Sequence, residues 1–306
     1  MIKIDQLTRQ FDEFTAVDNL SFDVSPGEVV GFLGPNGAGK STTMKMITGF
    51  LPISSGSVTI FGHDIEESPE DVKRIIGYLP EGAPSYGDMT VVQFLSFIAD
   101  IRGLSGEEKR VRIKDVVNSV QLESVLNRPI DNLSKGFKRR VGLAQAIIHD
   151  PKILILDEPT DGLDPNQKHH VRELIANLAK DKIVIVSTHI LEEVTAVCNR
   201  AIIISQGKKL FDGDPATLEA KSGYHHAVTI NFDQVPESLD VLEAVRNVER
   251  LTVNQNVVTV FPTDGEIIYH DVFDCIQQQT WNIHSIFAEK GRLDDVFRDM
   301  TALESN

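Results

Sequence analysis

Short apolar runs alternate with stretches of helical spacing over about the first 220 residues. Residues 29–33 (VVGFL) and 153–156 (ILIL) are apolar runs of strand length. A run without polar alternation suits a parallel strand that is covered on both faces. After Thr90, apolar residues recur at helical spacing, at Val91, Phe94, Leu95, Ile98 and Ile101. This alternation of strands and helices predicts a layered α/β domain.

The pattern changes after Lys221-Ser222-Gly223. There we predict a strand at 227–232, a helix at 238–246, strands at 248–253 and 257–261, a helix at 266–279, a strand at 282–287 and a last helix at 293–303. The first six elements follow the order βαββαβ, which is that of ferredoxin-like folds. We therefore expect an α/β domain over residues 1–222, with a helical subdomain at about 82–150, and a small α+β domain over residues 223–306.

Composition narrows the class of protein. The chain has 306 residues, 41% of them apolar, and a formal net charge of -15. The acidic balance argues against DNA or RNA as a partner, because phosphate contacts need clustered Lys and Arg. Two cysteines make no disulfide framework, and no apolar run reaches the ~18 residues of a membrane span. With no signal peptide evident, we expect a soluble chain in the cytoplasm.

The strongest motif is "EVVGFLGPNGAGKST", a predicted strand, a glycine-rich loop and a predicted helix. In this context the spacing G-x-x-x-x-G-K-S is a phosphate-binding loop, whose backbone N–H groups surround a phosphate at a helix N-terminus. Lys40 is the expected point charge for the β- and γ-phosphates, and the Ser41 hydroxyl is an expected Mg²⁺ ligand. The predicted ATP-binding residues of this loop are Gly34, Pro35, Asn36, Gly37, Ala38, Gly39, Lys40, Ser41 and Thr42.

Two adjacent carboxylates follow the apolar run 153–156. Asp157 is placed to hold Mg²⁺ directly or through water, because ligands of parallel sheets lie at the carboxyl ends of the strands. Glu158, one residue further, can then act as the general base for an attacking water. The alternative is an exposed strand end, which the phosphate loop earlier in the chain makes less attractive.

A third signal is the helix start in "NLSKGFKRRVGLAQAI", residues 132–147. Ser134 can cap this helix, but capping requires neither a glycine nor two basic residues at the helix start. Because a helix N-terminus attracts anions, the segment is a candidate for binding negative charge. Capping boxes are also predicted at Thr90-x-x-Gln93 and Ser105-x-x-Glu108.

The order of the phosphate loop, "LSKGF", "LILDEP", "DGLDP" and "STH" resembles the ATP-binding subunits of ABC transporters, in their exporter-type branch. The resemblance covers nearly all of residues 1 to 220. It implies that Ser134, Lys135 and Gly136 form the signature that contacts the ATP of a partner chain. It further implies an inter-protomer loop at Asp164 and a γ-phosphate contact at His189.

The same resemblance assigns the nucleoside. Phe11 matches the aromatic position that stacks on adenine, and Val17 matches the apolar residue beside the sugar. Base–aromatic stacking tolerates any base, so we expect only a weak preference for ATP over GTP. Taken alone, Phe11 would be interpreted as a core residue and His189 as the cap of a strand end; the order of the motifs favours the nucleotide roles instead.

Two motifs depart from the family pattern. The usual signature LSGGQ reads LSKGF here, so that Lys135 and Phe137 differ while Ser134 and Gly136 remain. Glu81 stands where most members carry a glutamine that senses Mg²⁺ and the membrane partner. A carboxylate can also ligate Mg²⁺, and the alternative is a solvated loop glutamate.

The resemblance implies an ATPase that uses ATP and Mg²⁺, pairs head to tail with a second ATPase chain, and drives a membrane-spanning permease from the inner face of the membrane. Tyr86, Met89 and Phe97 are candidates for docking the permease. Two alternatives are soluble ABC ATPases. One acts in DNA repair or chromosome organisation and needs a long coiled-coil insertion, for which the segment between Lys40 and Ser134 is too short. The other acts in translation and normally carries two ATPase halves with basic linkers.

Overall fold

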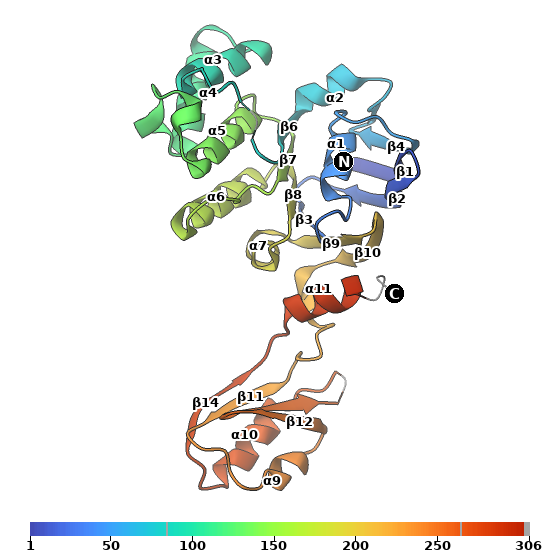
Figure 1. The fold of residues 1–306 in the computed structure, drawn as a ribbon, viewed down its shortest axis with the longest axis vertical. Coiled ribbons are helices and arrows are strands. Elements are labelled where there is room, and N and C mark those ends of the chain that lie inside the picture. Colours follow the sequence, from blue (N-terminus) through green and yellow to red (C-terminus); the bar gives the residue numbers. More distant parts are fainter. Residues whose placement is uncertain (84, 264, 303–306) are drawn as a thin grey trace. The chain divides into compact units, whose positions relative to one another are not determined.

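The computed structural model describes residues 1–83, 85–263 and 265–302, which divide into two compact units (Figure 1). The first unit spans Met1–Pro215 and the second begins at Ala216. The division lies a few residues before the boundary predicted at 222. The reason is local, since the Ser222 hydroxyl accepts a hydrogen bond from the backbone N–H of Arg292 (2.9 Å) and so belongs with the second unit.

A small antiparallel sheet opens the first unit, in the strand order β2-β1-β4-β5. Its strands are β1 (Ile2–Phe11), β2 (Phe14–Val24), β4 (Ser55–Ile60) and β5 (His63–Asp64). A two-residue turn joins β1 to β2, and Asp12 in this turn has a φ of 48°. This left-handed conformation is one that Asp tolerates and that tight hairpins require.

The second sheet of this unit has six strands in the order β10-β9-β3-β8-β7-β6. They are β3 (Val29–Leu33), β6 (Ile76–Leu79), β7 (Ile153–Asp157), β8 (Ile183–Thr188), β9 (Arg200–Ser205) and β10 (Lys208–Gly213). All pair in parallel except β10, which is antiparallel to β9. β3 and β7 are buried throughout, as their apolar runs predicted. Their carboxyl ends lie at the same edge of the sheet.

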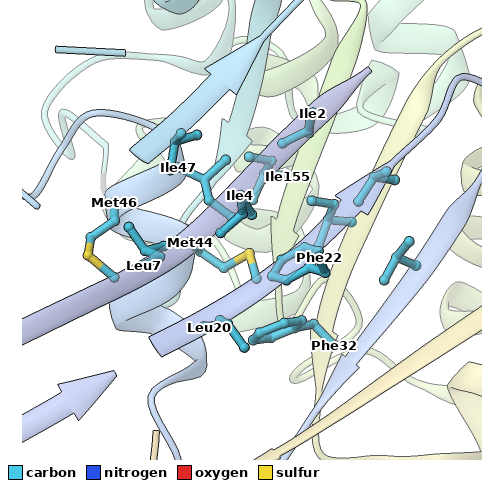
Figure 2. Close-up of a cluster of buried hydrophobic side chains, with 14 of the residues drawn as sticks. Ile2, Ile4, Leu7, Leu20, Phe22, Phe32, Met44, Met46, Ile47 and Ile155 are labelled. Atoms are coloured by element: carbon cyan, nitrogen blue, oxygen red, sulfur yellow. The ribbon is translucent and has the colours of Figure 1, made fainter. Parts of the chain in front are cut away.

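Helix α1 (Lys40–Ile47) lies against both sheets. Its Met44 packs in one apolar cluster with Ile4 and Phe22 from the first sheet and with Ile155 from the second (Figure 2). All four side chains are at most 5% exposed. Because the helix is fixed by this core, the loop before it has a defined position over the sheet edge.

Figure 1 shows α3 (Val91–Ile101), α4 (Gly106–Ser119) and α5 (Lys135–Ile147) gathered in the region predicted as a helical subdomain, where α5 also packs against β6. The capping box at Thr90 is confirmed, because Thr90 and Gln93 exchange both hydrogen bonds. The box at Ser105 is wrong. Ser105 precedes α4, but its side chain makes no cap bond within the described residues, and the left-handed Gly106 (φ 57°) follows it directly.

The other helices of the first unit are α2 (Pro69–Ile75), α6 (Pro165–Leu178) and α7 (Leu191–Val197), and α8 (Pro215–Glu219) crosses the division between the units. Single 3₁₀ turns occur at Glu123–Val125 and Ile130–Asn132. No helix in the described ranges is both long enough and apolar enough to span a bilayer.

The second unit contains β11 (Val228–Phe232), α9 (Asp240–Glu243), β12 (Val248–Asn254), β13 (Val257–Pro262), α10 (Tyr269–Gln277), β14 (Ile283–Ala288) and α11 (Leu293–Ala302). Its sheet is antiparallel in the order β12-β13-β11-β14. The predicted element order is therefore present. The helix predicted at 238–246 is shorter, and Leu303 of the predicted last helix lies outside the described residues.

Candidate functional site

The loop between β3 and α1 is built on glycines at positions where a side chain would clash or strain the backbone. Gly37 and Gly39 have φ values of 80° and 103°. A Cβ atom on Gly34 would lie 2.5 Å from the Ile204 carbonyl oxygen, and one on Gly39 would lie 2.5 Å from the Ala16 carbonyl oxygen. Gly39 also precedes the first turn of α1, where no side chain of the described residues caps the helix. The N–H groups of that turn are thus available to an anion.

Lys40 points back into this loop. Its ammonium group donates to the carbonyl oxygens of Gly34 (2.7 Å) and Pro35 (3.1 Å), and the residue is 7% exposed. Burial lowers the pKa of Lys40, and the carboxylates of Glu158 and Asp157 act in the opposite direction. A cation in this position favours phosphate groups, which offer charged acceptors in place of neutral carbonyls.

A cavity of about 460 Å³ joins part of the loop to four other predicted residues, Phe11, Glu81, Asp157 and Glu158. It is lined by Phe11, Phe14, Ala16, Asn36, Gly37, Gly39, Lys40, Ser41, Thr42, Glu81, Asp157 and Glu158. Chain segments far apart in sequence therefore meet around one space. Glu81 is exposed and lines the cavity, which is the location that a Mg²⁺-sensing role requires.

Asp157 is the last residue of β7 and is 1% exposed. Its Oδ2 atom is buried and has no hydrogen-bond partner among the described residues. A buried carboxylate oxygen without a partner costs free energy, and a metal ion with its water shell would remove that cost. Ser41, at the start of α1, lines the same cavity. Hydroxyl and carboxylate oxygens fit Mg²⁺, whose remaining ligands are commonly water and substrate phosphates.

Glu158 and His189 form a pair at the cavity. The Nδ1 atom of His189 lies 2.8 Å from the Oε1 atom of Glu158. Burial raises the pKa of Glu158, and the hydrogen bond from His189 lowers it. The two groups come from the ends of neighbouring parallel strands, β7 and β8. A carboxylate with a raised pKa, held by an imidazole, suits proton transfer.

Two aromatic side chains stand exposed at the mouth of the cavity. Phe11 and Phe14 are 40% and 63% exposed and face each other across the hairpin of β1 and β2. The Arg9 guanidinium lies 4.5 Å from the Phe11 ring. Such exposed rings can stack on a base. Phe14 was not predicted, although the sequence F-D-E-F already places two aromatic residues around a two-residue turn.

The assignment of Val17 is wrong. Val17 is 0% exposed and belongs to the apolar cluster of the core, so it cannot lie beside a sugar. Ala16 lines the cavity instead. Val17 packs close to the phosphate loop, where its Cγ2 atom would be 3.3 Å from a Cβ on Gly39.

The signature residues lie elsewhere. Ser134, Lys135 and Gly136 are not among the described residues that line the cavity. The Ser134 hydroxyl accepts from the Phe137 backbone N–H (3.4 Å), which confirms the predicted cap. Lys135 pairs with Asp161 (2.8 Å), and a Cβ on Gly136 would be 2.9 Å from Gln167 Oε1.

Asp164 has a structural role within its own chain. Its carboxylate caps α6 by accepting from the backbone N–H of Gln167 (2.9 Å). It follows Gly162, which packs against the Lys135 side chain, so this loop lies beside the start of α5. The two segments that the resemblance assigns to a dimer contact are therefore adjacent.

Known proteins match the part of the chain that carries this site. The family described as ABC transporter matches residues 17–161. The probable multidrug ABC transporter ATP-binding protein YbhF of Escherichia coli (strain K12) is 37% identical over 226 residues, which are 72% of this chain and 38% of that protein. The Nod factor export ATP-binding protein I of Burkholderia pseudomallei (strain 1710b) is 37% identical over 224 residues, which are 72% of this chain and 74% of that protein.

A solved structure agrees with these matches. It is a dimeric ATP-binding cassette in a post-hydrolysis state, bound to ADP and Pi. The TM-score is 0.65 at 25% identity, over 70% of this chain and 98% of that one. The chain spans well under half of YbhF but about three quarters of the Nod factor export protein. By its sequence and by its fold, this chain belongs to the family of ABC transporter ATP-binding proteins.

Proposed function

We propose that the chain is the ATP-hydrolysing subunit of an ABC exporter and works with a separate membrane-spanning subunit. The observation that carries this proposal is the arrangement around Asp157. A buried carboxylate oxygen without a partner among the described residues shares one cavity with the phosphate loop and with Glu158. Metal-assisted phosphoryl transfer to water uses these groups in this arrangement.

Each residue then has a defined task. Ser41 and Asp157 would hold Mg²⁺, with Glu81 as a further oxygen at the same cavity. The metal ion supplies positive charge that neutralises the phosphates. Lys40 and the N–H groups of the loop bind and orient the phosphates. Glu158 accepts the proton of the attacking water.

His189 has two tasks in this proposal. Its hydrogen bond holds the Glu158 carboxylate in place and opposes the rise in pKa that burial causes, which favours the ionised form of the base. The imidazole is also 58% exposed. It can therefore reach toward a γ-phosphate that enters the cavity.

A second copy of the chain would complete the site. In the head-to-tail dimer that we propose, Ser134, Lys135 and Gly136 face the ATP held by the Lys40 of the other chain. Two observations support this: these residues are not among those described as lining their own cavity, and a similar cassette has been solved as a dimer. We further propose that ATP-dependent closing of this dimer drives transport.

The membrane subunit would dock on the helical region at the inner face of the membrane. Tyr86 is 58% exposed, and its ring lies 5.6 Å from that of Phe97. A second cavity of about 1030 Å³ is lined by the exposed Phe50 and Ile101, among other residues. Tyr86, Met89 and Phe97 are not among the described residues that line it. We extend the proposed docking surface to Phe50 and Ile101.

The second unit has a separate role in this proposal. We assign it a ferredoxin-like fold, which its element order and its antiparallel sheet order β12-β13-β11-β14 support. All nucleotide motifs precede residue 190. The unit would therefore support dimerisation or regulation, and not nucleotide binding.

The test of the proposed function is the substitution Glu158→Gln in the full chain. It keeps the size of the side chain and removes the base, so hydrolysis should fall by about 100-fold or more while ATP binding persists. ATP-bound dimers should then accumulate and appear in gel filtration. The exposed Glu192, in α7, gives a matched control, and Glu192→Gln should leave turnover unchanged. Undiminished hydrolysis by Glu158→Gln would contradict the assigned base.

A further inference from the structure

Arg139 lies in the second turn of α5 and is 5% exposed. Its guanidinium donates to three backbone carbonyl oxygens outside its own helix. One belongs to Pro80, at 3.0 Å, and the others belong to Asp157 and Glu158. The Arg139 side chain therefore connects α5 to Pro80, the residue before Glu81, and to the carboxyl end of β7.

The carboxylates near Arg139 oppose the effect of burial on its charge. Burial lowers the pKa of Arg139, and the carboxylates of Asp157, Asp161, Glu158 and Glu81 oppose that shift. A buried guanidinium is costly unless charges and hydrogen bonds compensate. Here the compensating charges are largely the acidic groups at the cavity. The position of Arg139 is thus tied to the site and not only to helix packing.

The backbone of Glu158 is the group most affected. Glu158 has a φ of 52°, a left-handed conformation that is unfavourable for a residue other than glycine. Such a conformation persists where several contacts determine it. The Glu158 N–H donates to the Ser187 carbonyl oxygen (2.9 Å), and its own carbonyl oxygen accepts from the N–H of Asp161 (3.1 Å) and from Arg139. The residue with this backbone conformation, Glu158, also makes the side-chain contact with His189.

We propose that Arg139 is a positioning residue for hydrolysis: it holds the strained backbone of Glu158, and with it the base, against the loop that carries Glu81. The proposal rests on the ATPase function proposed above. Because Arg139 belongs to the helix that Ser134 begins, displacement of α5 would move the support of Glu158. ATP binding uses the phosphate loop and does not depend on this support.

The neighbouring Arg140 provides a matched control. It lies on the same helix and is also 5% exposed. Its guanidinium donates to the carbonyl oxygens of Val120 (3.3 Å) and Gln121 (2.9 Å) and stacks over the Phe137 ring. These partners all belong to the helical region. Loss of Arg140 should therefore remove a comparable buried cation without releasing Glu158.

The experiment compares Arg139→Met, Arg139→Lys and Arg140→Met in the full chain, by kcat, KM, ATP affinity and thermal unfolding. Arg139→Met should lower kcat by about 10- to 100-fold, the usual range for supporting groups of a catalytic site, with KM within about threefold. Arg139→Lys, which keeps the charge and loses the fork, should recover part of kcat. Arg140→Met should unfold at a similarly reduced temperature and keep kcat within about threefold.

Three results would overturn the proposal: a wild-type kcat in Arg139→Met, an equal fall of kcat in both Met variants, or a KM effect that accounts for the whole change. If Arg139→Met does not fold, the Lys variant decides. Lowered kcat at unchanged KM in a folded Arg139→Lys supports the proposal, and a wild-type kcat overturns it. Failure of the proposed function looks different, because hydrolysis would then persist in Glu158→Gln.

Discussion

The first turns of α1 and α5 are built in opposite ways, although both follow small or polar residues and carry basic ones. α1 begins after Gly39, without a side-chain cap among the described residues, and its Lys40, Ser41 and Thr42 line the cavity. α5 begins after Ser134, whose hydroxyl caps the helix within its own chain. Its first turn is absent from the described lining of that cavity.

The difference between α1 and α5 separates two tasks that depend on the same electrostatic attraction. A helix N-terminus attracts anions in both places. At α1 the glycine loop, the buried Lys40 and the cavity complete the receptor in one chain. At α5 the proposed receptor residues Ser134 and Lys135 are exposed, and Lys135 pairs with Asp161 (2.8 Å), with both side chains at least half exposed. Such an exposed pair contributes little stability, so Lys135 can exchange Asp161 for a phosphate at small cost.

The largest expected effect concerns the phosphate loop that precedes α1. Lys40→Ala should weaken ATP binding and reduce hydrolysis by about 100-fold or more, because Lys40 is the buried cation of the loop. Lys45 lies on the same helix but in its last turn, so Lys45→Ala should change ATP affinity little. Binding is measured by equilibrium dialysis with radiolabelled ATP. Equal affinities of wild type and Lys40→Ala would break the account of the loop.

His189→Ala should change how hydrolysis depends on pH. Burial raises the pKa of Glu158 and the hydrogen bond from His189 lowers it, so removing that bond raises the pKa further. The base must be ionised, so activity falls as the pH drops through this pKa. The acid limb of kcat should therefore move to higher pH in His189→Ala. The exposed His169, on α6, is the control. If the acid limb of kcat does not move in His189→Ala, His189 does not influence the pKa of the base Glu158.

Glu81 should have a smaller effect on turnover. If Glu81 takes the place of the usual glutamine, Glu81→Gln should stay within about tenfold of wild type, a barrier change of ~1.4 kcal/mol. Glu81→Ala should lose more activity and require more Mg²⁺, because an oxygen at the cavity is removed. Hydrolysis is measured across a Mg²⁺ titration. Superimposable titrations of wild type and Glu81→Ala would leave Glu81 as a solvated loop residue.

The smallest effect is expected from removing the second unit. A chain that ends at Gly223 keeps every residue that lines the cavity, because these residues all belong to Met1–Pro215. ATP affinity should stay within about twofold of the full chain. The truncated chain is checked for folding by circular dichroism before the binding measurement. A folded truncated chain without ATP affinity would show that the second unit serves the site.

Predictions succeeded where neighbouring residues decide the local structure. The caps at Thr90 and Ser134 and the strand–loop–helix around Lys40 are all local arrangements, and the structure contains them. The cap at Ser105 failed although the sequence match was as good. There Gly106 takes a left-handed φ, a conformation that glycine permits but that the capping-box pattern does not consider.

The site was harder to predict where distant segments meet. Arg139 looked like one of several basic residues near a helix start, but its partners lie 18 to 59 positions away along the chain. Only tertiary packing brings those carbonyl oxygens together. Val17 failed for a related reason, because its burial in the core depends on how β2 packs against α1.

The most direct test of the split site mixes two inactive chains. Lys40→Ala damages the phosphate loop, and Ser134→Glu places a carboxylate at the start of α5, where it would repel a phosphate. A mixed dimer then has one site with an intact loop and an intact signature, and one doubly damaged site. We predict that the mixture recovers hydrolysis, up to about half of wild type per mixed dimer, or at least traps ATP if both sites must act together. Neither hydrolysis nor trapped ATP in proven mixed dimers would mean that Ser134 serves its own chain, which contradicts the account.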